Sequence, residues 1–557
     1  MNQQLKNSLV GIRGKCLLIA VFLSCFVQPL YAASQQSQIS QFGITWTFDK
    51  NYTVGQFANN DYWVVGPVTI IRIQPVSVEL NDRMINGSMI NPSPRLGQRQ
   101  GYDSAAYGRY ARPGDFDPSL NAARPNNEQL STSNPLVLQP NCSLVSTEST
   151  LQANDSTQLK TAAVLTVLDA PAKEGSFRPP YSGFDKTIRF NKELLDYSLL
   201  ANLKPVPGTP RLTEVERYFE RPWIDHIPLW PATALHPVDN MPPYGREIST
   251  QIGVGALMLH LNFTNTMKEK LLVRYVQLGI DLYGIVQDGG EKNWTGMGGH
   301  ASGRKWPILF TGLVLNDPNM KNIGRTDILD YDPTHPEYVH FGEDDQTFYV
   351  TEADVEATHG SLWNPDRRDA QKIPYEKEDI GLPEWGIVHA DGPERSNKFW
   401  DTAYRQVSSP GWGGFVLAAR IMKAKDLWNH DALFDYKDRY MQIETKWRQT
   451  SKFVLSMWNT YRKDYGPVWT MSPKLHIAAT GGTVTKEPDK PVYALGEKVR
   501  IKAIPDTRYE FISWSGGFVE KTNPATIIMH SNWSITANFV GGPSANNPVC
   551  DKTVCSK

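Results

Sequence analysis

Three short runs in the middle of the chain combine acid–base side chains with glycine and proline. The first, residues 236–247, carries His236, Asn240, Tyr244 and Arg246 directly before an apolar run with helical spacing. The N–H groups and the dipole at the start of a helix favour an anionic ligand. We therefore predict an anion-binding site here. The alternative is a proline-stiffened connection with ordinary surface ion pairs.

The second run, residues 298–307, is rich in glycine and holds His300, Arg304 and Trp306. Glycine lets a backbone approach a ligand closely. Histidine accepts a proton near neutral pH, and arginine grips a carboxylate through two hydrogen bonds. We predict a base at His300 and a carboxylate ligand at Arg304. The alternative is a histidine that makes only structural hydrogen bonds.

The third run, residues 397–406, ends in Tyr404 and Arg405, the same pair of residue types as in the first run. We predict that both line the site, whereas Trp400 is more typical of core packing at the start of a helix. Arg178 lies in a separate proline-rich string and is a further candidate, although packing at a domain junction explains that string equally well.

Together these residue types suit the cleavage of a uronate polymer by β-elimination. The reaction requires a neutralised C6 carboxylate, a base for the C5 proton and an acid for the leaving oxygen. The predicted catalytic residues are Asn240, Tyr244, His300, Arg304 and Tyr404. The predicted substrate-binding residues are Arg178, His236, Arg246, Trp306 and Arg405.

Two alternatives remain open. A glycoside hydrolase needs two carboxyl groups, and the candidates for that pair are Asp225, Asp239, Glu247 and Glu384. A surface adhesin would use the same aromatic loops only to bind glycans, because flat amphipathic rings suit sugar faces.

Several other functions are excluded by composition and motif. The chain has 57 Lys and Arg against 58 Asp and Glu, so its net charge of -1 gives no footprint for nucleic acid. The sequence contains no phosphate-binding loop, dinucleotide fingerprint, zinc-protease helix or serine elbow. We predict no cofactor. Calcium at the acidic run 343–345 stays open, although that run lacks the alternating spacing of a known calcium loop.

The elements that must position these runs change type along the chain. Residues 34–190 alternate aromatic and β-branched residues with polar ones, which is typical of strands, and are interrupted at 86–133 by Gly, Pro, Asn and Arg. After residue 190 the apolar spacing becomes helical. The predicted helices span residues 213–219, 248–261, 267–286, 304–315, 415–424 and 433–447.

These patterns predict a multidomain α+β protein. We expect a β-sandwich-like domain with a long insertion at residues 33–190 and a helical catalytic domain at 191–470. Repeated helical hairpins favour an α/α toroid, and the irregular stretch 317–404 suits a loop-lined cleft better than a bundle connection. In architecture and residue types the central region resembles the α/α-toroid polysaccharide lyases. That resemblance implies a secreted lyase that works with Asn, His, Tyr and Arg.

The C-terminal strings predict a small all-β module at residues 475–541. Short strand-like segments are separated by turn residues, with a Trp-Ser-Gly turn at 514–516 and a closing Ala-Asn-Phe strand at 537–539. These strings resemble the divergent internalin-type B-repeat of bacterial surface and secreted proteins. The resemblance implies an accessory adhesion or stalk module, separable from the catalytic region, that attaches to a cell surface or an insoluble polymer.

The two ends of the chain indicate export. Residues 1–32 read as a signal peptide, because basic residues precede a short apolar run that ends in small residues. We expect a secreted, periplasmic or cell-surface protein without a transmembrane segment, since that apolar run is too short to span a bilayer. Cys550 and Cys555 lie in the polar tail at 542–557 and are expected to form a disulfide.

Overall fold

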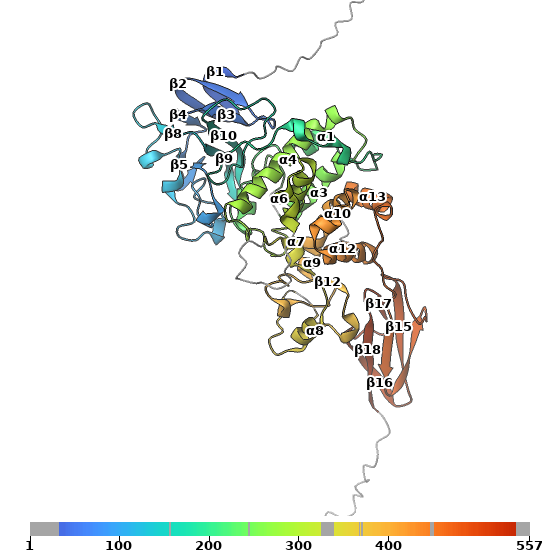
Figure 1. Cartoon of the computed structure of the whole chain (residues 1–557). Helices are drawn as coiled ribbons and strands as arrows, with labels where there is room; N and C mark the ends of the chain where they lie inside the picture. The colour runs from blue at the N-terminus through green and yellow to red at the C-terminus, as the bar shows by residue number, and fades with distance from the viewer. Residues whose placement is uncertain are drawn as a thin grey trace, which may run out of the picture.

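The computed structural model describes residues 33–154, 157–242, 245–324, 339–366, 368, 371–445 and 451–541. An N-terminal sheet, a central helical part and a C-terminal pair of small sheets follow one another along the molecule (Figure 1). The expected mixture of helices and strands is confirmed. The predicted signal peptide and the cysteines Cys550 and Cys555 lie outside the described residues.

The N-terminal part is a single eight-stranded sheet curled into a half-barrel. Its order is β7-β9-β10-β3-β2-β4-β8, and β1 pairs with β2. The strands are β1 (Ser34–Gln41), β2 (Ile44–Gln56), β3 (Tyr62–Val65), β4 (Val68–Gln74), β7 (Ser88–Ile90), β8 (Leu136–Leu138), β9 (Cys142–Asn154) and β10 (Thr157–Leu168). A separate two-stranded sheet joins β5 (Val78–Leu80) to β6 (Arg83–Ile85).

This half-barrel differs from the sandwich that the sequence predicts. The short strand β3 pairs antiparallel with β2 and parallel with β10, which joins the two halves into one sheet. The alternating burial of Ile44, Trp46 and Phe48 on β2 gives the sheet a buried face, as predicted. Side-chain alternation tells which face is buried but not which strands share hydrogen bonds.

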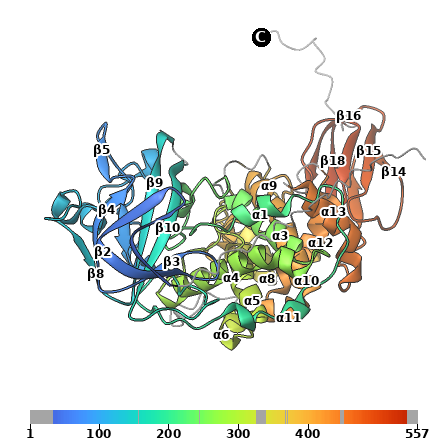
Figure 2. The ribbon, with the colours of Figure 1, turned by 90° about the horizontal axis from the view of Figure 1, so that it is seen from above.

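The long insertion of the N-terminal domain packs against the helices. Met89, Tyr102, Ala106 and Tyr107 are buried and belong to the same apolar cluster as the central helical core. Seen from above, the sheet lies on one side of the helices and the C-terminal sheets lie on the other (Figure 2). The insertion is therefore part of the joint between the two domains.

The six helices predicted from periodicity are confirmed, with ends shifted by up to about four residues. The side chain of Thr264 caps α4 by accepting from the backbone of Met267, as the polar connection between the second and third of these helices predicts. The helices are α1 (Leu212–Arg217), α2 (Pro231–Leu235), α3 (Gly245–Leu259), α4 (Asn265–Gln287), α5 (Lys305–Val314), α6 (Pro318–Lys321), α7 (Gly342–Asp345), α8 (Glu352–His359), α9 (Ala403–Ser408), α10 (Gly413–Ile421), α11 (Lys425–Trp428), α12 (Asp431–Ile443) and α13 (Lys452–Tyr461).

Within this helical part a short antiparallel pair joins β11 (Thr347–Tyr349) to β12 (Pro383–Trp385). Helix α3 packs on α4 and α10, and α4 packs on α5. Among the described residues, no helix has both the length and the apolar character needed to cross a membrane.

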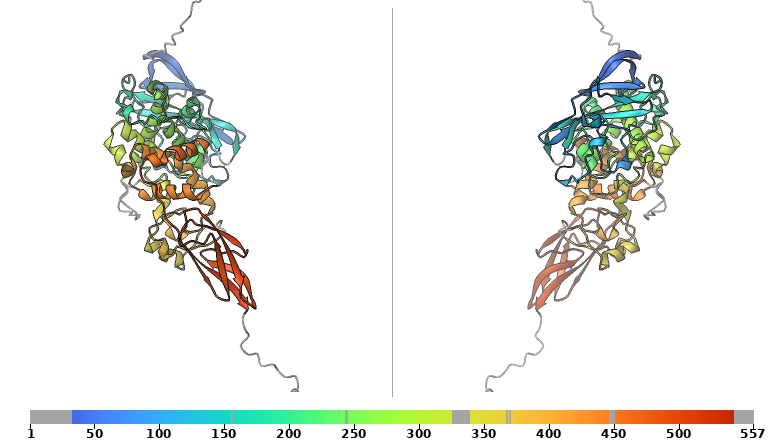
Figure 3. Two further views of the ribbon diagram at one scale, coloured as in Figure 1. Left: turned by 90° about the vertical axis from the view of Figure 1, so that its right-hand side faces the viewer. Right: turned by 90° about the vertical axis from the view of Figure 1, so that its left-hand side faces the viewer.

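The C-terminal module consists of two three-stranded sheets, ordered β13-β18-β16 and β14-β15-β17. Its strands are β13 (Leu475–Ala479), β14 (Gly482–Glu487), β15 (Lys498–Pro505), β16 (Tyr509–Gly516), β17 (Ala525–Ile528) and β18 (Trp533–Gly541). Side views show it at one end of an elongated molecule, opposite the half-barrel (Figure 3).

The module docks on the central part through buried contacts. The guanidinium of Arg439 on α12 donates to the carbonyl of His530 at 2.8 and 3.1 Å, and Lys398 donates to the carbonyl of Asn532 at 2.9 Å. Ile373 from the central part belongs to the apolar core of the module. Arg439, Lys398 and Ile373 are all at least 97% buried, so the contact is not a flexible tether.

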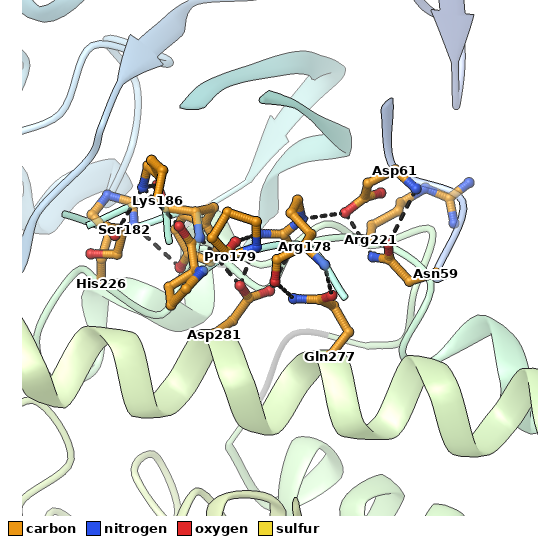
Figure 4. Close-up of polar contacts among 12 residues, drawn as sticks. Asn59, Asp61, Arg178, Pro179, Ser182, Lys186, Arg221, His226, Gln277 and Asp281 are labelled. Atoms are coloured by element: carbon orange, nitrogen blue, oxygen red, sulfur yellow. Dashed lines mark hydrogen bonds and ion pairs between the residues drawn. The ribbon is translucent and has the colours of Figure 1, made fainter. Parts of the chain in front are cut away.

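A buried arginine joins the half-barrel to the helices (Figure 4). Arg178 donates to Asp61, which follows β2, at 2.6 Å, and to both carboxylate oxygens of Asp281 on α4 at 2.9 and 2.6 Å. Its backbone N–H and C=O are bonded to the side chain of Gln277. Burial alone would lower the pKa of Arg178, but the two facing carboxylates raise it above its ordinary value. The side chain predicted to bind substrate therefore holds two domains together.

Replacing Arg178 by methionine should lower the free energy of unfolding by about 3–5 kcal/mol, because two buried carboxylates lose their partner. Arg189→Met is the control, since Arg189 and its partner Asp185 are both more than half exposed; that variant should lose less than about 1 kcal/mol. Urea denaturation measures both. A loss of similar size in the two variants would contradict the role given to Arg178.

A substitution at Gly496, in the C-terminal module, tests whether the module is held by its contact with α12. This residue has φ of +80°, and a Cβ there would lie 2.7 Å from the carbonyl oxygen of Gln442 on α12. Gly381 has φ of +85° with nothing within 4 Å, so Gly381→Ala reports the backbone cost alone. We expect Gly496→Ala to lose about 1–3 kcal/mol more than Gly381→Ala in urea denaturation. Equal losses would mean that this contact does not hold the module.

Candidate functional site

The three predicted runs meet at the glycine loop, residues 298–303. A Cβ on Gly245, the first residue of α3, would lie 2.2 Å from the Cα of His300. A Cβ on Gly298, which has φ of +59°, would lie 2.9 Å from the ring of Tyr404. These approaches are closer than any side chain tolerates, so glycine is needed on both sides. The glycine loop therefore touches the first run through Gly245 and the third run through Tyr404.

A cleft of about 470 Å³ opens beside this loop. It contains two of the predicted catalytic side chains, His300 and Tyr404. The residues that line it are Trp230, Met297, Gly298, His300, Asn364, Pro365, Asp366, Arg368, Ile387, Val388, Arg395 and Tyr404. Most of the remaining lining comes from the irregular stretch 317–404, which the sequence predicts to line a cleft.

His300 is held as a neutral base at this cleft. Burial, followed by the nearby charge of Arg304, lowers the pKa of His300 to about 4. An imidazole with this pKa is unprotonated at neutral pH, but it is a weaker base than an ordinary histidine because its surroundings disfavour the charged form. The role of His300 as a base stays a prediction.

Arg304 lies beneath the glycine loop and supports it. Its guanidinium binds both oxygens of Asp225 at 2.9 and 3.2 Å and donates to the carbonyl of Ser302 at 3.0 Å. The side chain is 1% exposed. A guanidinium engaged in this way positions His300 through the backbone. It does not line the cleft as a carboxylate ligand.

Further buried groups fix the loop from its other side. The side-chain amide of Gln346 donates to the carbonyls of Gly298 and Ile387, both at 2.9 Å. The carboxyl of Glu343 on α7 accepts from the backbone of Gly303 at 2.8 Å. These bonds tie the loop to the segment that carries the opposite wall of the cleft.

Two arginines at the cleft are accessible to a ligand. Arg368 is exposed, and its guanidinium lies 4.7 Å from the centre of the Tyr404 ring. Arg395 is 42% exposed and lies 3.9 Å from Asp366, a long contact for an ion pair. Both are therefore better placed than Arg304 to bind an anionic group.

Arg405, the residue after Tyr404, is fully buried. It donates to Glu384 at 2.5 Å, and its guanidinium lies 4.5 Å from the ring of Trp400. Glu384 also accepts from Arg439 at 3.0 Å. Burial would raise the pKa of Glu384, but the two guanidinium groups hold it below its ordinary value. Arg405 does not line the cleft, and Trp400 packs in the core as predicted.

The other predicted site residues lie away from the lining of the cleft. Asn240 is 4% exposed and donates weakly to the carbonyl of Arg221 at 3.4 Å. His236 is fully buried against Trp223, and Trp306 is fully buried in a stack on Trp428. Arg246 is one-quarter exposed and pairs with the adjacent Glu247. Tyr244 lies outside the described residues.

The acidic run 343–345 is bonded within the protein. Asp344 accepts from Lys305 and from the indole of Trp428, and Asp345 accepts from the backbone of Gly296. Within the described ranges, no group of three or more His, Cys, Asp or Glu side chains is arranged to hold a metal ion.

Sequence reasoning missed Trp230, Arg368 and Arg395. Trp230 lies between Pro228 and Pro231 and belongs to no motif, while Arg368 and Arg395 lie in the long irregular stretch. The one sequence signal for these residues was the prediction that the irregular stretch lines a cleft. Within that stretch, the polar run at 364–368, with Asn, Pro, Asp and two Arg, has the composition of a binding loop.

Comparison with known families identifies the C-terminal module. Residues 474–543 match the family model of the divergent InlB B-repeat domain. The resemblance predicted from its turn and closing strand is confirmed, over all six strands β13 to β18. Searches of curated proteins and of solved structures find no match to the chain.

The state of His300 predicts a specific pH dependence. The native pKa of about 4 lies below the ordinary value of 6.5, so the unfolded chain binds the extra proton first and stability falls as pH drops from 6.5 towards 4. In His300→Ala, the slope of unfolding free energy against pH should become shallower by up to about 1.4 kcal/mol per pH unit in this window. Urea denaturation at several pH values measures it. An unchanged slope would show that His300 is protonated equally in both states.

Proposed function

We propose that this protein is a secreted polysaccharide lyase that cleaves a uronate-containing polymer by β-elimination. The observation that carries the proposal is the shared cleft of His300 and Tyr404, which also contains the accessible arginines Arg368 and Arg395. A neutral base, a phenol and two cations are the groups that this reaction needs.

Each group has a role in the proposed reaction. Arg368 and Arg395 bind the C6 carboxylate of the uronate, which makes the C5 proton more acidic. The imidazole of His300 takes that proton, and the electron pair forms the C4–C5 double bond as the bond from C4 to the glycosidic oxygen breaks. The phenol of Tyr404 gives its proton to the leaving oxygen. Arg304 and Gln346 act as positioning residues, because they hold the backbone of the glycine loop.

The distribution of carboxylates favours a lyase over a hydrolase. Among the described residues that line the cleft, Asp366 is the one carboxylate. Asp225 and Glu384 are both buried in ion pairs with arginine, and Asp239 and Glu247 each face an arginine. A hydrolase needs two carboxyl groups facing one glycosidic bond.

The helix packing and the two ends of the chain support the proposed architecture and location. The pairing of α3 with α4 and α10 supports an α/α-toroid-like arrangement of the central helices. The divergent InlB B-repeat at the C-terminus and the signal-like N-terminal segment support a secreted, periplasmic or cell-surface location, with attachment to a cell surface or an insoluble polymer through the module.

Incubation with uronate polymers tests the proposal directly. We expect ultraviolet absorbance from unsaturated uronate ends together with new reducing ends. His300→Ala should lower turnover by about 10²–10⁴, the usual size for loss of a positioned base. His359→Ala is the control, because that histidine is nearly half exposed and lies outside the lining of the cleft. Reducing ends without the absorbance would mean a hydrolase, and binding without either product would mean an adhesin.

A further inference from the structure

We propose that Trp230, held by two tyrosines of the N-terminal insertion, forms a stacking subsite for a sugar ring at the edge of the cleft. The subsite rests on the proposed function only in taking a polysaccharide as the ligand. It names a binding contact that neither the sequence motifs nor the family match assigns.

Trp230 is the aromatic wall of the cleft on the side of the half-barrel. It lines the cleft with Met297, Gly298 and His300 and is half-buried. The preceding residue, Leu229, has φ of +62°, a left-handed conformation that is rare for leucine. Strained backbone of this kind persists where the surrounding structure imposes it, often at ligand sites.

The insertion of the N-terminal domain reaches over to this tryptophan. Tyr110 meets the indole edge to face at 5.1 Å between ring centres, and Tyr107 does so at 6.4 Å. Tyr107 is fully buried and donates its hydroxyl to the carbonyl of Gln98 at 2.7 Å. Tyr110 is 51% exposed. The cluster of Trp230, Tyr107 and Tyr110 is therefore fixed in the domain joint through Tyr107 and exposed to solvent through Tyr110.

An exposed aromatic cluster fixed by a buried one is suited to binding a flat, partly apolar surface. Two ring contacts restrict the indole before any ligand arrives, so little side-chain entropy is lost on binding. The pyranose ring presents an apolar face bordered by hydroxyl groups, and an aromatic ring with a polar edge complements both. The cleft volume of about 470 Å³ lies in the usual range for small-molecule sites, roughly 300–1,000 Å³.

The rest of the cleft explains why the stacked ring belongs to a polymer. Arg368 lies against Tyr404, and Arg395 lies beside Asp366. These guanidinium groups recognise charge, whereas the indole recognises a ring face whatever its charge. A chain of sugar rings supplies both features at once, so stacking should add affinity for acidic and neutral polymers alike.

The test measures binding by full-length protein in affinity electrophoresis, using polygalacturonate, its methyl ester, alginate and hyaluronan as probes. The His300→Ala background prevents turnover. Trp230→Ala should weaken binding about tenfold to both polygalacturonate and its ester, and Trp230→Phe should restore most of the affinity. Arg368→Gln should weaken binding to the acid but not to the ester. Thermal unfolding of each variant checks that the fold is intact.

Phe184→Ala is the matched control, because Phe184 is 76% exposed but lines a different groove, at the junction of the two domains. It should bind like the His300→Ala parent. Weakening by Phe184→Ala but not by Trp230→Ala would overturn the subsite, as would the absence of binding to every probe. Weakening by Trp230→Ala without unsaturated products from wild-type protein would leave the subsite standing and remove the lyase proposal. Unsaturated products from wild-type protein, without any weakening of binding by Trp230→Ala, would remove the subsite and leave the lyase proposal standing.

Discussion

Close packing against the glycine loop, at Gly245 and at Gly298, is the constraint on which the candidate site depends. Gly245 lies against His300, and Gly298 lies against Tyr404, at separations that leave no room for a Cβ. Three segments that are more than 50 residues apart in sequence therefore meet at one point. Any side chain at either glycine would separate His300 from the start of α3 or from Tyr404, so the order of the cleft depends on these two positions.

Buried arginines supply the framework around that point. Arg178 joins the half-barrel to α4, Arg304 supports the glycine loop, and Arg405 next to Tyr404 pairs with Glu384. Each is paired with a buried carboxylate, so removing one partner would leave an uncompensated charge. The sequence predicted all three as site residues: Arg178 and Arg304 stand next to proline or glycine, and Arg405 follows Tyr404 in a pair like that of the first run. Their real partners, such as Asp61 for Arg178 and Asp225 for Arg304, are distant in sequence and carry no local signal.

The parts of the fold that were predictable are those governed by local periodicity. Helices α3, α4 and α12 follow from apolar spacing, and the module follows from its turn residues and closing strand. The curled sheet was not predictable, because its closure depends on the pairing of β3 with both β2 and β10. For the candidate site, His300 and Tyr404 were predicted from their residue types and the runs that hold them, and both line the cleft. Trp230 was not, because its role depends on Tyr110 across a domain boundary.

The docking of the C-terminal module changes how its role should be understood. Glu384 accepts from Arg405 on the cleft side and from Arg439 on the module side, and Arg439 in turn donates to the carbonyl of His530 in the module. The ring of Trp400 lies against both guanidinium groups and against His530. Because every member of this chain is buried, none of them is free to exchange its partner for water. The arginine next to Tyr404 and the seat of the module therefore belong to one hydrogen-bonded unit. The divergent InlB B-repeat domain of this protein is thus linked, through Arg439 and Glu384, to the arginine that follows Tyr404 in the chain.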